Sequence, residues 1–340
     1  MKLFITGGAG FIGSCFVRLA LQQISDCQII NFDALTYAGN LDNLLGVDPA
    51  RHRFVQGDIS DREAVKTTLT SDIDAIINFA AESHVDRSIT NAGEFLRANV
   101  IGTQVLLDAA RSCGIKRFVQ VSTDEVMGSL REDETSCFTE ESGFAPNSPY
   151  AASKAAAEHL VRAAHHTFGL DTVITRCGNN YGPRQFPEKF LPLAIANALN
   201  DQPIPVYGDG QNVRDWIYVE DHCRAVLRVM QDGAPGATYN IGARNQRRNL
   251  DVVTSLLETL GKPRTLIKFV KDRPGHDRRY AIDPSKAEEE LGWQPVESWD
   301  SGLQKTIDWY LKNNEWMERA RSGAYRDYYK NQYGTEVVGI

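Results

Sequence analysis

The sequence contains no run of 18 or more apolar residues, no CxxC pair and no excess of basic residues. The first absence argues against a membrane-spanning helix. The start, Met1–Gly8, also lacks the apolar segment and cleavage site of a signal peptide. The six scattered cysteines favour a reducing cytoplasm and predict no metal site. A net charge of −7 argues against a broad nucleic-acid surface, although a local basic pocket for a phosphorylated ligand is compatible with it.

Short apolar runs alternate with helical patterns through residues 1–178. The predicted strands are Lys2–Thr6, Gln28–Asp33, Phe54–Asp58, Ala75–Ala80, Phe118–Thr123 and Val173–Cys177. The helical patterns include Gly13–Gln23, Ile101–Cys113 and Ala151–Thr167. This alternation predicts an α/β fold with a Rossmann-type doubly wound parallel sheet and helices on both of its faces. The continuous hydrophobicity of the strands agrees, because both faces of such a sheet are covered.

The pattern changes after residue 178, where prolines become frequent and the alternation breaks. At 340 residues the chain also exceeds the ~250–300 residues at which single cores stop growing. We therefore expect residues 1–178 to form the cofactor domain and residues 179–211 and 246–340 to form a smaller C-terminal α/β substrate lobe. A strand near 212–245, at Thr238–Ile241, is expected to return to the main sheet.

A glycine-rich turn follows the first predicted strand and opens a helix. Glycine is needed there because a side chain would keep the backbone from the pyrophosphate of a dinucleotide, which lies at the helix N-terminus. Its position in a strand–turn–helix context makes the motif specific for NAD-type cofactors. The residues involved are Gly7, Gly10, Phe11, Ile12 and Gly13.

Two aspartates close later strands of the predicted sheet. Asp33 lies 20 residues after Gly13, where a carboxylate can accept hydrogen bonds from the adenosine ribose and repel a 2′-phosphate, which selects NAD over NADP. Asp58, with Ile59 beside it, is placed to meet the adenine. The alternative for both aspartates is that they only cap helices.

Tyr150 and Lys154 lie four residues apart at the start of a predicted helix. Ser148 and Pro149 supply a cap and a first-turn proline. The spacing puts the phenol and the ammonium on one face, where a cation is expected to lower the tyrosine pKa and make a usable base. The alternative is an ordinary surface pair.

Thr123, Asp124 and Glu125 end another apolar strand, at the edge of the sheet where ligands bind. Different surroundings can separate the pKa values of two carboxyls and leave one as an acid and the other as a base. An exposed acidic turn is the alternative interpretation.

These motifs together resemble the extended short-chain dehydrogenase/reductases, and within them the dTDP-glucose 4,6-dehydratases. The stretches that carry the resemblance are TGGAGFIG (6–13), NFDALTYAGNL (31–41), AAESHVDRSI (80–89), STDEV (122–126), SPYAASKAAAEHL (148–160), NNYGPRQFPEK (179–189), VYGDGQNVRDWIYVEDH (206–222) and DRPGHDRRYAID (272–283). They span the chain nearly end to end.

The resemblance implies a lyase that binds NAD tightly and acts on a nucleotide-diphosphate sugar. Tyr150, with Thr123 and Lys154, would take the 4-hydroxyl proton, Glu125 would take the C5 proton, and Asp124 would protonate the departing 6-hydroxyl. Ala80 joins the implied cofactor contacts. The implied substrate contacts are His84, Ser88, Asn180, Lys189, Pro205, Tyr207, Arg214, Asn249, His276 and Arg278. A homodimer, packed through the helices near 101–113 and 151–167, is also implied.

One residue departs from the family pattern, since Met127 stands where the family has tyrosine. This puts the shape of the sugar pocket in doubt. A 4,6-dehydratase of UDP-glucose stays open, because a pocket discriminates one methyl group by only ~1–3 kcal/mol. A 4-epimerase would need the tyrosine and lysine but not two acids, and a UDP-glucuronate decarboxylase would lack the aspartate. A non-catalytic NAD-binding sensor or interaction module is the alternative of another class.

Overall fold

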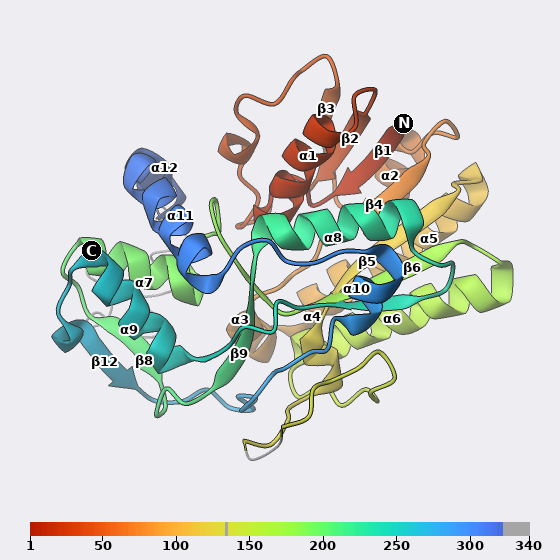
Figure 1. The fold of residues 1–340 in the computed structure, drawn as a ribbon. Coiled ribbons are helices and arrows are strands. Elements are labelled where there is room, and N and C mark those ends of the chain that lie inside the picture. The colour runs from red at the N-terminus through yellow and green to blue at the C-terminus, as the bar shows by residue number, and fades with distance from the viewer. Residues whose placement is uncertain (133–134, 322–340) are drawn as a thin grey trace.

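A seven-stranded parallel sheet forms the centre of the computed structural model, which describes residues 1–132 and 135–321 (Figure 1). The strand order is β10-β6-β5-β4-β1-β2-β3. Its strands are β1 (Lys2–Thr6), β2 (Gln28–Asp33), β3 (His52–Gln56), β4 (Ala75–Asn78), β5 (Arg117–Thr123), β6 (Thr172–Cys177) and β10 (Thr238–Ile241). This is the order of a doubly wound dinucleotide-binding sheet with one added strand, so the predicted fold class is confirmed.

Two predicted strands end earlier than expected, β3 at Gln56 and β4 at Asn78. The third strand also begins earlier, at His52, which pairs with Ile29 of β2. β3 is the edge of the sheet and is partly exposed, so it does not need a continuous apolar run. Asp58 consequently lies in the loop that follows β3 rather than at the end of the strand.

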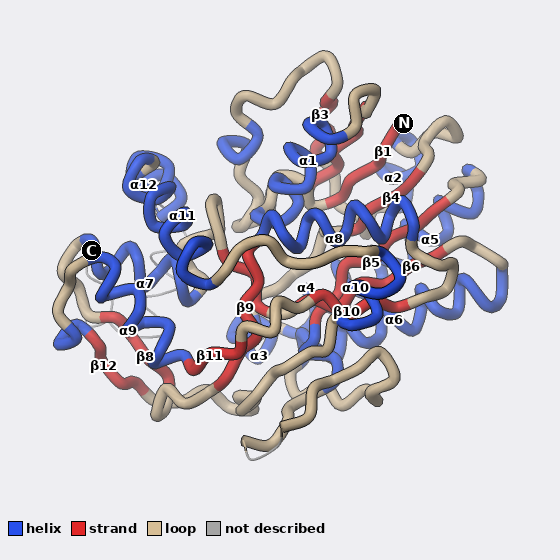
Figure 2. The backbone as a smooth tube through the Cα atoms, in the orientation of Figure 1, coloured by secondary structure: helices blue, strands red, loops and turns tan. Residues whose placement is uncertain are grey.

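Helices cover both faces of this sheet (Figure 2). One face carries α1 (Phe11–Gln23), α8 (Val219–Asp232) and α10 (Ser285–Leu291), and the other carries α2 (Arg62–Thr68), α5 (Gly102–Cys113) and α6 (Pro149–Phe168). Alternate side chains of β1 show the two faces: Leu3 and Ile5 pack with α1 and α8, whereas Phe4 packs with α5. The shorter helices are η1 (Leu41–Leu44), α3 (Val85–Thr90), α4 (Ala92–Phe95), the π-helix η2 (Leu96–Ile101) and η3 (Asp124–Met127).

A second lobe with its own core lies beside the sheet (Figure 1, left). It contains β7 (Asn179–Tyr181), α7 (Phe190–Leu199), β8 (Ile204–Tyr207), β9 (Val213–Tyr218), β11 (Gln246–Arg248), α9 (Asn249–Leu260), η4 (Arg264–Leu266), β12 (Ile267–Val270), α11 (Trp299–Lys312) and α12 (Asn314–Arg321). Its strands form two small sheets, β11-β9-β7 and β12-β8. Aromatic side chains dominate its core, among them Tyr181, Trp216, Trp299, Tyr310 and Trp316.

The chain returns from this lobe to the main sheet, but later than residue 212. β9 pairs with β7 and β11 in the second lobe, so of residues 212–245 only α8 and β10 join the main sheet and its covering helices. From the predicted substrate lobe, α10 also packs on the main sheet. The predicted strand Thr238–Ile241 is confirmed. The division of function between the two units stays a prediction, and residues 322–340 of the predicted substrate lobe lie outside the described residues.

A buried ion pair links helix α6 to strand β6. Arg176 of β6 and Glu158 of α6 are both almost inaccessible, and their charged atoms approach to 2.9 Å. Arg176 also donates to the Glu140 carbonyl at 3.3 Å and to the Met127 sulfur at 3.7 Å. Since the sheet is covered here, neither charge can exchange its partner for water.

Removing one member of this pair should therefore cost more than removing both. We expect Arg176→Leu to lower the free energy of unfolding by about 3–5 kcal/mol, because Glu158 is left buried and uncompensated. Adding Glu158→Leu should recover most of that loss. Urea unfolding followed by fluorescence measures both values; a double variant as unstable as the single one would contradict the argument.

Candidate active site

The turn between β1 and α1 is built so tightly that two of its positions require glycine. Gly7 has a φ of +69°, and a Cβ there would lie 2.6 Å from the Ala80 nitrogen after β4. A Cβ on Gly13 would lie 2.2 Å from the Gly7 carbonyl oxygen. The turn is thus pressed against the neighbouring strand, and the N-terminus of α1 opens onto the space above it, where a pyrophosphate can bind.

A cavity of about 320 Å³ opens above this turn, at the carboxyl ends of the central strands. Its size and glycine-lined floor fit the dinucleotide that the motif predicts. Every residue predicted to contact the cofactor lines it, namely Gly7, Gly10, Phe11, Ile12, Gly13, Asp33, Asp58, Ile59, Ala80, Tyr150 and Lys154.

The two aspartates of this cavity have different surroundings. Asp33 accepts hydrogen bonds from the backbone nitrogens of Ala9 and Leu35, at 2.9 and 2.8 Å, and burial raises its pKa. Burial acts in the same direction on Asp58, but hydrogen bonds from Arg97 and Ser60 outweigh it and lower the pKa. Neither carboxylate caps one of the neighbouring helices, since Gly10 caps α1 and Asp61 caps α2.

The five predicted catalytic residues meet at the wall of the same cavity. Thr123 ends β5, and its hydroxyl accepts a hydrogen bond from the Glu125 nitrogen at 3.3 Å, which begins the short helix η3. On α6, the Ser148 hydroxyl caps the helix at the Ala151 nitrogen, 3.0 Å away. Lys154 Nζ donates to the Val121 carbonyl of β5 at 2.7 Å. That bond fixes α6 against the strand that carries the two acids.

The two acids have different electrostatic surroundings. Burial, followed by the nearby Glu125 and Asp215 carboxyls, raises the pKa of Asp124 well above its usual value. Burial also raises the pKa of Glu125, but the guanidinium groups of Arg214 and Arg273 oppose that rise. Asp124 is therefore suited to hold a proton, and Glu125 is the one of the pair suited to accept one.

The expectation for Tyr150 is wrong. Its pKa is raised well above the usual value, first by burial and then by the Glu125 carboxyl, while a hydrogen bond with Thr123 opposes the rise. Burial also lowers the pKa of Lys154 to about 8. The spacing of four residues predicted only the Lys154 cation, which would lower the pKa of Tyr150. In the folded protein the phenol is also buried and lies near two carboxyls, and both of these raise its pKa.

A second cavity, of about 200 Å³, lies between the sheet and the second lobe. Eight of the predicted substrate contacts line it: His84, Asn180, Lys189, Pro205, Tyr207, Arg214, Asn249 and His276. The two cavities share a wall made of Ser83, Glu125, Asn179, Asn180, Gln185, Glu188 and Lys189. Glu125 therefore faces both spaces.

Two predicted substrate residues do not line either cavity. Ser88 is fully buried in α3, and its hydroxyl donates to the Val85 carbonyl at 2.6 Å. Arg278 points away and pairs with Asp209, at 2.8 Å, and with Glu132. Arg273, five residues earlier, lines the second cavity in its place. The turn at Gly275, with φ of +65°, separates the two arginines, and the motif alone did not reveal which of them faces inward.

Met127 lines neither cavity. Its side chain is buried among Val126, Phe138, Ala155 and Ile282. The sulfur lies 3.7 Å from the guanidinium of Arg176, which belongs to β6. The departure from the family pattern consequently changes the packing behind α6 and not the lining of the site.

A charged cluster at the shared wall was not anticipated from the sequence. Glu188 is buried, with His84 Nε2 at 3.7 Å and the Arg87 guanidinium at 3.6 Å. Burial raises the pKa of Glu188 to about 7. The Arg87 guanidinium lies over the Tyr37 ring, 3.8 Å from its centre. Tyr37 and Arg87 lie within the quoted motifs at 31–41 and 80–89, which was the only available signal.

Comparison with known proteins agrees with this geometry. The protein-family model for GDP-mannose 4,6 dehydratase matches residues 4–306. The dTDP-glucose 4,6-dehydratase of Xanthomonas campestris pv. campestris (strain B100) is 51% identical over 95% of this chain and 96% of its own. That of Shigella flexneri is 47% identical over 98% and 99%.

A solved structure extends the likeness to the fold. The dTDP-glucose 4,6-dehydratase of Streptomyces venezuelae, crystallised with NAD bound, is 48% identical, with a TM-score of 0.91 over 94% of this chain and 100% of that one. With such identity over nearly the full length of each protein, this chain belongs to the dTDP-glucose 4,6-dehydratase family.

Proposed function

We propose that this protein is an NAD-dependent hydro-lyase that converts dTDP-glucose to dTDP-4-keto-6-deoxyglucose and water. One observation carries the proposal beyond family membership: a buried acid pair of unequal pKa stands where the cofactor cavity meets the second cavity. Oxidation alone would need the tyrosine and the lysine. Elimination of water needs an acid and a base in addition.

The chemistry divides between the cofactor and the chain. NAD, when held by the glycine turn and Asp33, supplies the hydride acceptor for C4 and the hydride donor for C6, so no net oxidation results. Tyr150 receives the 4-hydroxyl proton. Only its phenolate form can accept that proton, and because burial raises the pKa of the phenol, this form needs a cation close by; the Lys154 ammonium is the group one helical turn away.

Glu125 and Asp124 carry the elimination. Glu125 takes the C5 proton, which the 4-keto group has made acidic, and Asp124 gives its proton to the departing 6-hydroxyl so that water leaves. The pKa order of the two carboxyls matches these roles. Glu125 can then return a proton to C5 as C6 is reduced.

The second cavity is the proposed site of the nucleotide. Arg214, Arg273 and Lys189 bring positive charge to it, and an arginine can engage a diphosphate bidentately. The Arg214 guanidinium is held by the Asp277 carbonyl at 2.9 Å and lies over the Tyr280 ring. Pro205 and Tyr207 line the same space and are the proposed neighbours of the base.

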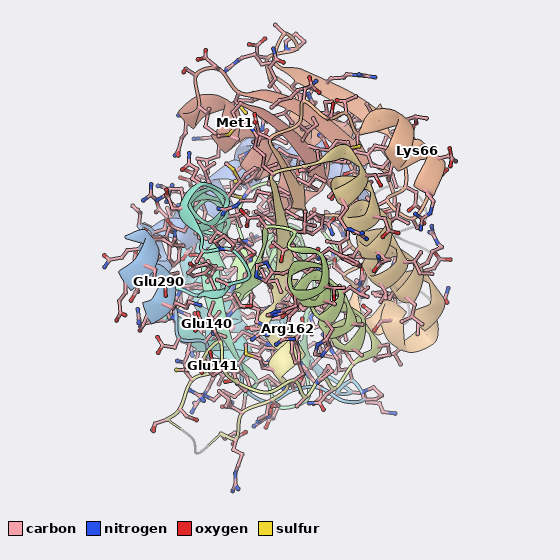
Figure 3. All side chains as sticks on the ribbon, turned by 90° about the vertical axis from the view of Figure 1, so that its right-hand side faces the viewer. Met1, Lys66, Glu140, Glu141, Arg162 and Glu290 are labelled. Atoms are coloured by element: carbon pink, nitrogen blue, oxygen red, sulfur yellow. The ribbon has the colours of Figure 1, made fainter. Side chains whose placement is uncertain are left out.

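We also propose that the protein works as a homodimer in the cytoplasm. The helices expected at the interface, α5 and α6, lie together on one side of the molecule, where Arg162 of α6 is exposed (Figure 3). The six cysteines are free, and no helix among residues 1–132 and 135–321 is long and apolar enough to cross a membrane. Sedimentation equilibrium tests the dimer.

The first experiment is to offer the purified protein dTDP-glucose and UDP-glucose separately. We expect dTDP-glucose to lose one water, with product mass as the measurement, and to be preferred by about tenfold or more, since tenfold is the lower end of the discrimination that a pocket gives for one methyl group. If only UDP-glucose lost water, the proposed mechanism would stand, but the nucleobase of the substrate would be uracil rather than thymine. If neither sugar lost water, the proposed function would be wrong.

Substituting the proposed C5 base separates chemistry from cofactor binding. Glu125→Gln should lower kcat by about 10²–10⁴ while bound NAD stays at the wild-type level, because the amide keeps the shape but cannot accept a proton. Product mass and the absorbance of released NAD measure the two quantities. Glu132→Gln, on an exposed loop, is the matched control and should retain activity. If Glu125→Gln kept full activity, Glu125 would not be the base that takes the C5 proton.

The pKa order also predicts the pH profile. Activity should fall as the pH drops through the raised pKa of Glu125, which must be ionised, and as it rises through that of Asp124, which must be protonated. Arg214 lowers both values, so Arg214→Gln should move both limbs of the bell to higher pH. Profiles of kcat at saturating substrate measure this. If neither limb of the profile moved, the assignment of the acid and the base would be contradicted. Arg117→Gln, far from the site, is the control for a general loss of stability.

A further inference from the structure

A histidine behind the site contacts a residue that faces both cavities. His222 lies on α8 and is fully buried, and it lines neither cavity. Its Nδ1 is 2.9 Å from Oδ1 of Asn180. Asn180 lies in β7, immediately after β6, and its side chain borders the cofactor cavity and the second cavity alike.

The direction of this hydrogen bond follows from the groups involved. A carboxamide oxygen can only accept, so the imidazole carries its proton on Nδ1. Burial lowers the pKa of His222 to about 3, which keeps the ring neutral. Nε2 is then an acceptor, and within the described part of the chain it is buried without a hydrogen-bond partner. The contact with Asn180 is therefore the one polar interaction that compensates for burying this ring.

The bond also fixes how the Asn180 amide is turned. With Oδ1 against the imidazole, Nδ2 faces the Gly178 carbonyl at 3.2 Å and the Cys177 sulfur at 3.4 Å, at the carboxyl end of β6. A half-turn of the amide would set Oδ1 against the Gly178 carbonyl oxygen, acceptor against acceptor, and would require the other tautomer of His222. The amide is thus held in one orientation at the place where its side chain borders both cavities.

We propose that His222 is a positioning residue of the active site, which holds the Asn180 amide in its ligand-binding orientation where the cofactor and nucleotide-sugar cavities meet. The role of the ligand rests on the proposed function, whereas the geometry does not. His222 touches neither the cofactor nor the substrate and acts only through Asn180.

A double-mutant cycle tests this proposal. His222→Leu removes the donor and keeps an apolar side chain of similar bulk, and Asn180→Ala removes its partner. The affinity for thymidine diphosphate, by calorimetry, and the bound NAD are measured for wild type, both single variants and the double variant. Because neither readout needs turnover, failure of the proposed reaction would not obscure the result. KM and kcat for dTDP-glucose are measured in parallel.

We expect His222→Leu to weaken one of the two ligands by roughly tenfold, the size of a lost hydrogen bond that leaves a buried group unsatisfied. In the Asn180→Ala background the same substitution should change that affinity by less than about twofold, since the residue through which it acts is gone. His222→Gln keeps an amide donor and should restore most of the loss. The effect should appear in KM more than in kcat.

Two results would overturn the proposal. Unchanged affinity for both ligands in a folded His222→Leu protein would show that Asn180 needs no support. An equal loss in both backgrounds would show that His222 acts on the fold at large. Val226→Ala, also buried on α8 but without contact to Asn180, is the matched control for that second case. If leucine prevents folding, His222→Met replaces it in the cycle.

Discussion

Keeping two neighbouring carboxyls out of water is the constraint on which the rest of this site depends. Asp124 and Glu125 follow each other at the end of β5, where burial raises both of their pKa values. The opposing charge comes from Arg214, which belongs to the second lobe. The pKa values of both acids therefore depend on the packing of this lobe against the sheet. The bond of Lys154 to Val121 and the Arg176–Glu158 pair keep α6 fixed on the other side.

Much of this arrangement could be predicted because it depends on neighbours in sequence. Strands buried on both faces leave continuous apolar runs, and the glycine turn needs only the strand before it and the helix after it. The edge strand β3 lacks such a run, so its bounds were misplaced. Arg273 and Arg278 show a different limit. They belong to one motif, and the partner that turns Arg278 outward, Asp209, lies 69 residues away.

Two further residues show that distance along the sequence differs from distance in space. Met127 is two residues from Glu125, and its departure from the family pattern put the shape of the sugar pocket in doubt. In a 3₁₀-helix with three residues per turn, however, residues two apart point to different sides, and η3 turns Met127 into the packing behind β5. For Tyr150 the helical spacing correctly placed Lys154 on the same side. It could not reveal that burial and two carboxyls on β5 would dominate the pKa of the phenol.

The charged cluster at the shared wall connects the segments that line the two cavities. In the proposed reaction the hydride that leaves C4 returns to the same sugar, so the reduced cofactor must stay until the cycle ends. Tyr37 belongs to the loop that lines the cofactor cavity, and it contacts Arg87 as well as the Phe186 ring, whose centre is 5.8 Å away. Arg87 in turn approaches Glu188, which borders both cavities. The loop that lines the cofactor cavity is consequently in contact with the segment that borders both cavities.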